Sequence, residues 1–360
     1  MRISDIDANF KVKSVNEPDV EWFEASETPF SLHGLFRGED GVFLRIPPEL
    51  GSSISGNMHW LAYNTAGGRL RFATDSPYVA IKAVIPKTDI LPHMTFVGSF
   101  GFTLYDGDFF VGMYTPQQSD YENDENGRIS FDGIRRFQQK GMHECTLFFP
   151  LYNGVKKLYI GLQKGCTLSA AKPYKYPRPA VFYGSSITQG GCTSRSGNDY
   201  VSVISKWLDT EIINLGFSGN AKAEPAMADY ICGIDASVYV LDYDYNAPDA
   251  AFLQKTHLPF YKMIRAQRKE TPIVFISKPD FDHDGASAQR REIVKKTYRY
   301  AKRSGDKNVY FIDGQSLFGK EHRDLCTVDT CHPNDLGFYR MAEKIAPVIK
   351  RILEKDTKHE

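Results

Sequence analysis

The sequence contains few cysteines and no paired cysteine motif. Six cysteines occur in 360 residues, and no two of them are spaced as C-x-x-C. Disulfide-stapled small folds are much denser in cysteine than this chain. We therefore predict that the cysteines are buried free thiols.

The chain also lacks an excess of charge and a long apolar segment. Its 44 basic and 44 acidic residues give a formal net charge of zero, which offers no electrostatic surface for nucleic acid or an anionic membrane. No stretch approaches the roughly 18 to 20 apolar residues that span a bilayer, and the opening residues contain no signal-peptide core. The sequence thus predicts a soluble protein, cytoplasmic as it stands or exported if a signal peptide has been removed. Its expected partner is a small molecule or a glycan.

The first half of the chain has the pattern of an all-β domain. From about residue 34 to residue 165, apolar residues occur in short runs broken by Gly, Asp and Pro, without a helical period. Asp106-Gly107 lies between two such runs and indicates a hairpin. We predict a β-sandwich of the jelly-roll type. The main strand candidates are Val42–Ile46, Leu70–Thr74, Val79–Ile85, Cys145–Phe149 and Leu158–Leu162.

A change of composition divides the chain. Residues 163–179 contain Pro173, Pro177 and Pro179 among small and basic residues, which is typical of a linker. Because 360 residues exceed the roughly 100 to 200 of most single domains, two domains are expected. We place an all-β accessory domain at residues 1–170 and an α/β domain at residues 171–360.

The second half alternates continuous apolar runs with helical periodicity. This alternation predicts a parallel sheet with helices on both faces, an α/β fold in which ligands bind at the carboxyl ends of the strands. Helical spacing is clearest in Tyr200–Leu208 and Phe338–Ile352. The predicted strands are residues 180–183, 211–216, 237–241, 272–277 and 308–312.

A serine, an aspartate and a histidine stand where such a sheet would bring them together. Ser186 follows the first strand, and Asp329 and His332 precede the last helix with D-x-x-H spacing. A serine hydroxyl is a weak nucleophile that needs a base, and the base needs a group that orients it. One turn of chain presents both members of a D-x-x-H pair, and an imidazole with a pKa of about 6.5 suits proton transfer near neutral pH. The three residues are therefore candidates for a catalytic triad.

Two further strand ends offer donors for an oxyanion. Residues 215–220, at the end of the second strand and directly after it, contain Gly216 and Gly219, and glycines let a backbone N–H approach a ligand closely. Asn246 follows the third strand and carries an amide donor. Ser, Gly, Asn and His thus follow strands one, two, three and five in that order.

In this order of motifs the sequence resembles the SGNH/GDSL hydrolase superfamily, in particular members with an N-terminal β-sandwich domain of the GxDLY kind and a G-S-S-I nucleophile block. The resemblance extends over nearly the whole chain. Gly184–Ile187 matches the first block, Asn214–Gly219 the second, Asn246 the third, and Asp329 with His332 the fifth. GGRLRFATDS at 67–76, GFTLY at 101–105 and PLYNGV at 150–155 look like the accompanying β domain.

The resemblance implies both a fold and a reaction. The fold is a flavodoxin-like three-layer α/β domain behind the β-sandwich. Ser186 would be the nucleophile, His332 the base and Asp329 its orienting group, while the N–H groups of Ser186 and Gly219 and the side chain of Asn246 would form the oxyanion hole. The expected enzyme is a serine esterase for short acyl esters, chiefly acetyl, of carbohydrates or small polar compounds, without a metal or an organic cofactor.

Three positions depart from the family pattern. Ser185 stands where Asp is commoner, so two adjacent serines compete for the nucleophile role, and we choose Ser186 because it holds the third position of G-x-S. Residues 243–245, Tyr-Asp-Tyr, replace the usual glycine-rich turn before Asn246. Thr103 in GFTLY stands where related sequences tend to have Asp.

Two other classes of function remain as alternatives. Asp242 and Asp244 follow a strand like the start of a haloacid-dehalogenase-type phosphatase motif, although Asn246 stands where that motif has Thr or Val. The other alternative is a glycan-binding protein with an inert hydrolase-like domain.

The remaining reactive side chains have simpler interpretations. His257 and His322 lack a carboxylate at D-x-x-H spacing and are predicted to be surface or capping residues. Cys192 lies in no Cys–His protease signature and is predicted to pack or to line the pocket.

Overall fold

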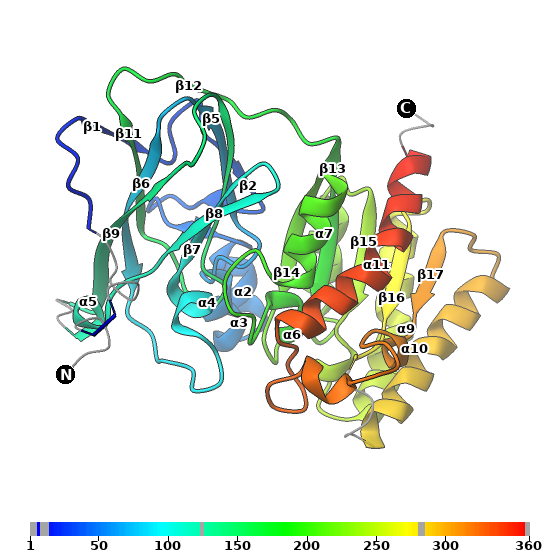
Figure 1. Ribbon diagram of the computed structural model, residues 1–360. Coiled ribbons are helices and arrows are strands. Elements are labelled where there is room, and N and C mark those ends of the chain that lie inside the picture. Colours follow the sequence, from blue (N-terminus) through cyan, green and yellow to red (C-terminus); the bar gives the residue numbers. More distant parts are fainter. Residues whose placement is uncertain (1–5, 8–13, 123–125, 280–284, 357–360) are drawn as a thin grey trace.

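The computed structural model describes residues 6–7, 14–122, 126–279 and 285–356 of the chain. A β-rich first part and an α/β second part lie side by side (Figure 1). Among the described residues, no helix combines the length and the apolar character needed to cross a bilayer.

The first part is built from antiparallel sheets. Its strands are β1 (Val20–Glu24), β2 (Ser31–His33), β3 (Phe36–Arg37), β4 (Phe43–Leu44), β5 (Arg69–Thr74), β6 (Tyr78–Pro86), β7 (Phe102–Asp106), β8 (Phe109–Tyr114), β9 (Arg128–Arg136), β10 (His143–Phe148), β11 (Lys157–Gln163) and β12 (Leu168–Ser169). Its short helices are α2 (Pro48–Ile54), α3 (Gly56–Ala62), α4 (Phe96–Phe100) and α5 (Gln118–Glu122).

Two of these sheets pack face to face. One has the order β1-β11-β6-β9, and the other has the order β12-β5-β10-β7-β8 with β2 beside β5. Apolar side chains of both sheets, such as Phe72 of β5 and Ile81 of β6, form one buried cluster. Alternation of buried and exposed residues along antiparallel strands produces such a core. The predicted hairpin is confirmed, since β7 and β8 are joined at Gly107, whose φ is +53°.

The second part is a parallel sheet between two helical layers. Its strands are β13 (Tyr176–Gly184), β14 (Thr210–Gly216), β15 (Val238–Asp242), β16 (Ile273–Ile276) and β17 (Val309–Ile312). Its helices are α6 (Ser186–Gln189), α7 (Tyr200–Leu208), α8 (Pro225–Gly233), α9 (Ala250–Gln267), α10 (Gly285–Arg303) and α11 (Asp335–Asp356), with short 3₁₀ turns η2 (Asp244–Asn246), η3 (Gly314–Ser316) and η4 (Arg323–Cys326).

Alternate residues of the strands face opposite helical layers. The order β14-β13-β15-β16-β17 is the flavodoxin-like order 2-1-3-4-5. Tyr183 of β13 packs in the cluster with α8, α9 and α10, whereas its neighbour Phe182 packs with α7 and α11. In Figure 1, α7 and α11 lie across one face of the sheet. The predicted three-layer α/β fold is therefore confirmed.

The predicted linker, residues 163–179, is shorter in the structure because both of its ends join sheets. Leu168–Ser169 pairs with β5 as β12, and β13 already begins at Tyr176. Pro177 and Pro179 lie inside β13, where the pairing with β14 skips from Tyr176 to Ala180. A proline is tolerated in a strand where its missing N–H is not needed. The proline content therefore predicted a longer linker than the structure has.

The two parts share a packed boundary. Leu61 of α3 belongs to the same buried cluster as Phe217 and Met227 of the second part. Arg69 of β5 is fully buried, and its Nη2 donates to Glu211 Oε1 at 2.6 Å. A buried arginine is tolerated when its donors are paired, so this ion pair fixes β5 against β14.

Candidate active site

Ser186 lies at the carboxyl end of the central strand β13. Ser185 is the N-cap of α6, and its Oγ accepts a hydrogen bond from the Ile187 N–H at 3.2 Å. Ser186 begins the helix, and its Oγ lies 2.9 Å from Nε2 of His332. Gly184 must be glycine, because a Cβ there would come within 1.9 Å of Thr188 Oγ1. The two adjacent serines thus have different partners, one a helix N–H and the other an imidazole.

The D-x-x-H turn directs both of its side chains to one point. Nδ1 of His332 lies 2.7 Å from Oδ2 of Asp329, and the His332 backbone N–H donates to Oδ1 at 2.7 Å. Partial burial raises the pKa of Asp329, but the hydrogen bonds from His332 outweigh it and hold that pKa below its usual value. An ionised carboxylate at Nδ1 favours the tautomer whose Nε2 lone pair faces Ser186. The structure therefore brings Ser186, His332 and Asp329 together in one chain of hydrogen bonds.

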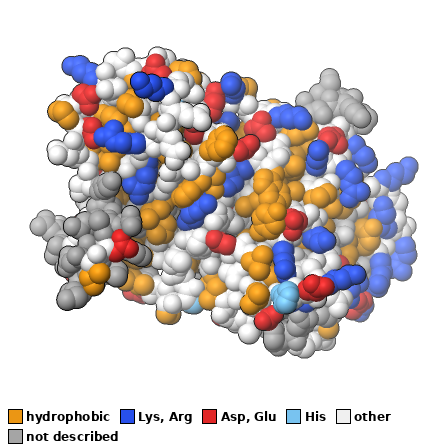
Figure 2. All heavy atoms as spheres, in the orientation of Figure 1, with side chains coloured by type: hydrophobic (Ala, Val, Ile, Leu, Met, Phe, Trp, Pro, Cys, Tyr) orange, Lys and Arg blue, Asp and Glu red, His pale blue; other side chains and the backbone are white. Residues whose placement is uncertain are grey.

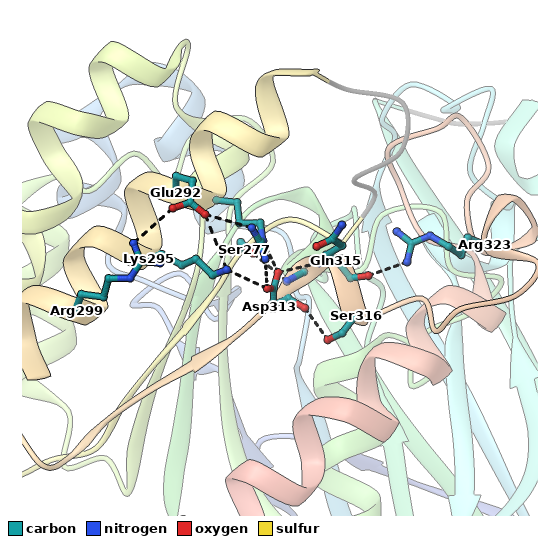
Figure 3. A network of polar contacts seen from close by, with 10 residues as sticks. Ser277, Glu292, Lys295, Arg299, Asp313, Gln315, Ser316 and Arg323 are labelled. Carbon is teal, nitrogen blue, oxygen red and sulfur yellow. Dashed lines mark hydrogen bonds and ion pairs between the residues drawn. The ribbon is translucent and has the colours of Figure 1, made fainter.

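An ion-pair network holds the segment that leads from β17 to this turn (Figure 3). Nε of Arg291 donates to Asp313 Oδ1 at 2.6 Å, and Lys295 Nζ lies 3.4 Å from Asp313 Oδ2. Further along the segment, Arg323 Nη1 donates to the Gln315 carbonyl at 2.7 Å. Figure 2 shows Lys and Arg side chains gathered at the edge where Figure 1 places α10. Two basic residues of α10, Arg291 and Lys295, form the ion pairs with Asp313.

The other end of the turn is held by Asp335, the first residue of α11. Its carboxylate accepts hydrogen bonds from the Ser194 N–H at 2.8 Å, from Thr193 Oγ1 at 2.9 Å and from Asn198 Nδ2 at 3.0 Å. These three donors lie on the loop that follows α6. The loop after Ser186 and the helix after His332 are thereby fixed to each other.

The segment after β14 borders the same site. The Ser218 N–H donates to Oε1 of Gln189 at 3.0 Å, and Gly219 is exposed with a φ of +67°, a left-handed conformation that glycine adopts without strain. Asn246, 9% exposed in η2, donates through Nδ2 to the Phe217 carbonyl at 2.9 Å. The structure thus joins Asn246 to the glycine loop, while neither residue has a hydrogen bond with Ser186.

A pocket of about 420 Å³ opens beside His332. Most of its wall comes from the first part of the chain, although Ser186, His332 and Asp329 all belong to the second part. Trp60 is half exposed at its edge, and Ser218 and Asn220 flank Gly219 in its wall. The full wall is Asn57, Trp60, Leu61, Thr88, Asp89, Leu91, His93, Met94, Ser99, Tyr152, Gly191, Cys192, Ser218, Asn220 and His332.

Sequence reasoning missed most of this wall. Among the wall residues of the first part, only Tyr152, in the PLYNGV block, carried a signal, and its hydroxyl donates to the Ser186 carbonyl at 3.4 Å. Trp60 and His93 lie in no recognised motif. Thr103, the departure in GFTLY, is fully buried and accepts a hydrogen bond from Ser196 Oγ at 3.1 Å. The GFTLY block therefore supports the loop after α6.

Asp242 and Asp244 are too enclosed to act on a substrate. Each is 2% exposed, and Asp242 Oδ2 accepts hydrogen bonds from Tyr200 Oη at 2.9 Å and Thr188 Oγ1 at 3.1 Å. Burial, reinforced by the neighbouring Asp244, raises the pKa of Asp242 to about 7. Burial likewise raises the pKa of Asp244 to about 6. The phosphatase interpretation needs an accessible, ionised pair, and this geometry argues against it.

The prediction for His257 is wrong, because α9 is covered by α10. His257 is 2% exposed, its Nδ1 lies 2.8 Å from Thr297 Oγ1, and burial lowers its pKa to about 3. His322 is exposed, in agreement with its prediction, and its side chain makes no capping hydrogen bond.

The cysteines are free thiols, as predicted, four of them buried and two half-buried. Cys192 lines the pocket, also as predicted. Burial, with smaller contributions from Asp329 and Cys331, raises its pKa to about 12, so the thiol is protonated and unsuited to nucleophilic attack at neutral pH. Its Sγ is nevertheless close to three other side chains that could hold a metal, His93, Asp329 and His332.

Two family models match the chain. The model of the GDSL-like Lipase/Acylhydrolase family matches residues 177–350, and the GxDLY model, the N-terminus of Esterase_SGNH_hydro-type, matches residues 20–168. No curated protein matches the chain.

Solved structures share the fold over nearly the full length. A protein from Bacteroides ovatus named as a GDSL-like lipase is 28% identical with a TM-score of 0.82, and the match covers 93% of this chain and 98% of that chain. The salicylyl-acyltransferase SsfX3 from a tetracycline biosynthetic pathway is 19% identical (TM-score 0.73, 92% and 98% covered). A family two carbohydrate esterase from Cellvibrio japonicus is 13% identical (TM-score 0.59, 93% and 98% covered).

The two models and the Bacteroides structure agree with the order of motifs and with the observed fold. The chain belongs to the SGNH/GDSL hydrolases, in the group with a GxDLY-type N-terminal region, and it is an esterase or acylhydrolase of that type.

Proposed function

We propose that this protein is a serine esterase that removes short acyl groups, chiefly acetyl, from carbohydrates or small polar compounds. The observation that carries the proposal is the chain of hydrogen bonds from Ser186 Oγ through the His332 ring to Asp329, with separations of 2.9 Å and 2.7 Å. His332 Nε2 takes the Ser186 proton as Oγ attacks the ester carbonyl, and Asp329 stabilises the imidazolium. The imidazolium then protonates the leaving alcohol, and a water activated in the same way releases the acid.

In this proposal the oxyanion is stabilised by the N–H groups of Ser186 and Gly219 and by the side chain of Asn246. Ser186 is the first residue of α6, so its N–H has no acceptor within that helix. Gly219 lies between two pocket-wall residues, Ser218 and Asn220. Donors that are already in place where charge develops stabilise the transition state without further reorganisation.

The pocket supports a small ester of a polar alcohol. It combines the half-exposed ring of Trp60 with polar side chains such as Asn57, Asp89 and Asn220, and a sugar presents both an apolar ring face and hydroxyl groups. A carbohydrate esterase is among the structures that share the fold. We also propose that residues 171–360 form the catalytic domain and that residues 1–170 form an accessory domain that supplies most of the pocket wall.

Hydrolysis assays test the substrate proposal. The wild-type protein should hydrolyse p-nitrophenyl acetate and release acetate from acetylated xylo-oligosaccharides, with or without EDTA. Trp60→Ala should raise KM for the acetylated sugar and change the hydrolysis of p-nitrophenyl acetate little. Failure to release acetate from any acetylated sugar would reject the carbohydrate substrate, and failure on both substrates would favour the inert glycan-binding alternative.

A further inference from the structure

Two side chains beside Ser186, His332 and Asp329 have no part in the proposed ester hydrolysis. His93 lies in the loop before α4, exposed, with its ring centroid 5.8 Å from that of His332. Cys192 is 6% exposed in the loop after α6, and both residues line the pocket. Each of His93, Cys192, Asp329 and His332 offers one ligand atom, and these atoms all lie within 4.8 Å of one another. Three separate segments of the chain thus bring four metal-ligating side chains to one point.

The ligand types at this point suit one kind of cation. Imidazole nitrogen, cysteine sulfur and carboxylate oxygen are the ligands of Zn²⁺, at about 2.0 to 2.3 Å, whereas Mg²⁺ and Ca²⁺ prefer oxygen alone. Tetrahedral bonds of that length put the ligand atoms roughly 3.3 to 3.8 Å apart, so the side chains have to close by about 1 Å. His93 is exposed on a loop and can turn toward the other three. The open pocket gives the ion a path of entry.

We infer that His93, Cys192, Asp329 and His332 form a binding site for Zn²⁺ and that the bound ion inhibits the esterase. The binding site itself is independent of the proposed function, whereas the inhibition rests on it. On binding, the Cys192 thiol gives its proton to solvent and an S–Zn bond forms, without a change of oxidation state.

Either nitrogen of His332 can serve as the ligand, and either choice blocks the reaction. An ion on Nε2 occupies the lone pair that receives the Ser186 proton. An ion on Nδ1 replaces the hydrogen bond with Asp329, which is 2.7 Å long. The ion is therefore an inhibitor and not a cofactor, so a chelator should not lower turnover.

Calorimetric titration of ZnCl₂ into the full-length Ser186→Ala variant tests the site without requiring esterase activity. One ion should bind per chain. His93→Ala and Cys192→Ser, each made in the Ser186→Ala background, should each raise Kd by roughly 10-fold or more, because each removes one of four ligands. His322→Ala and Cys166→Ser, which change residues outside the cluster and the pocket wall, are matched controls and should leave Kd unchanged. If the buried Cys192→Ser variant does not fold, the exposed His93 still provides the test.

The absorption of bound Co²⁺ and the kinetics of zinc inhibition provide two further tests of the site. Co²⁺ bound to Ser186→Ala should show a thiolate-to-cobalt absorption that Cys192→Ser loses. In the protein with Ser186 intact, ZnCl₂ should inhibit p-nitrophenyl acetate hydrolysis and MgCl₂ should not. His93→Ala should weaken that inhibition by roughly the same factor as its Kd, relative to its own uninhibited rate.

The outcomes separate the two proposals. Absence of zinc binding, or binding that neither His93→Ala nor Cys192→Ser weakens, would overturn the site. Zinc binding that both His93→Ala and Cys192→Ser weaken would uphold the site. If the protein with Ser186 intact hydrolysed no ester, only the proposed function would be rejected.

Discussion

Oε1 of Gln189 accepts a hydrogen bond from the backbone N–H of Ser218 at 3.0 Å. Gln189 ends the helix that begins with Ser186, and Ser218 precedes Gly219. Gln189 is fully buried, and its Nε2 also donates to the Leu151 carbonyl at 3.2 Å. One side chain therefore fixes the serine helix to both the glycine loop and the β-rich part of the chain.

Replacing this side chain should lower activity without changing the chemistry. Gln189→Ala should reduce kcat by roughly 10- to 100-fold, because the glycine loop is no longer held against α6. KM should change little, and the pH dependence of kcat should keep its midpoint. Gln267→Ala, which removes an exposed glutamine of α9, should have the wild-type kcat. Equal kcat values for the two variants would contradict a positioning role for Gln189.

Asn246 should act on the transition state more than on the bound ester. Asn246→Ala should lower kcat by about 10² to 10³ with little change in KM. The side chain does not titrate, so the pH midpoint of the acylation rate should stay at that of the wild-type protein. Steady-state kinetics over a pH series provide the measurement, with circular dichroism as a check on folding, because the contact with Phe217 is also lost. An undiminished kcat would remove Asn246 from the oxyanion hole.

The buried carboxyl of Asp242 should make stability depend on pH. Burial and the neighbouring Asp244 raise its pKa from 3.8 to about 7. Between these values the folded protein holds a proton that the unfolded chain has lost, so the free energy of unfolding falls as pH rises through this range. Asp242→Asn keeps a neutral side chain of similar shape and should show a smaller decrease between about pH 5 and about pH 8 in urea denaturation. The same decrease in both proteins would refute the assignment.

The parallel sheet could be predicted from the sequence because its signals are local. The continuous apolar run 180–183 lies inside β13, the run 272–277 exceeds β16 by one residue at each end, and each chemical motif follows a strand. The chain could also be matched to a family, so the order of motifs indicated which strand ends meet. Ser186, Asp329 and His332 were identified in this way, and the structure brings them together.

The pocket and the packing around it could not be predicted, because they depend on contacts between distant segments. His93 reaches His332 only through the docking of the β-rich part against the α/β part. His257 looked like a surface residue because the pattern of α9 does not reveal that α10 covers it. Pro177 and Pro179 suggested a linker because the register skip that accommodates them is a property of the neighbouring strand.

The adjacent serines Ser185 and Ser186 have different partners in the structure. Ser185 caps α6 through its Oγ, and an aspartate, the commoner family residue, can accept the same N–H. Ser185→Asp should therefore keep a rate close to that of the wild-type protein. Ser186 instead lies 2.9 Å from the His332 imidazole, and loss of a triad serine typically costs about 10⁶ in turnover.

The most direct test is kcat for p-nitrophenyl acetate hydrolysis by Ser186→Ala and by Ser185→Asp, both shown by circular dichroism to be folded. We predict almost complete loss of turnover for Ser186→Ala and near wild-type turnover for Ser185→Asp. Substantial turnover by folded Ser186→Ala, or loss of turnover in Ser185→Asp alone, would contradict the assignment of Ser186 as the nucleophile.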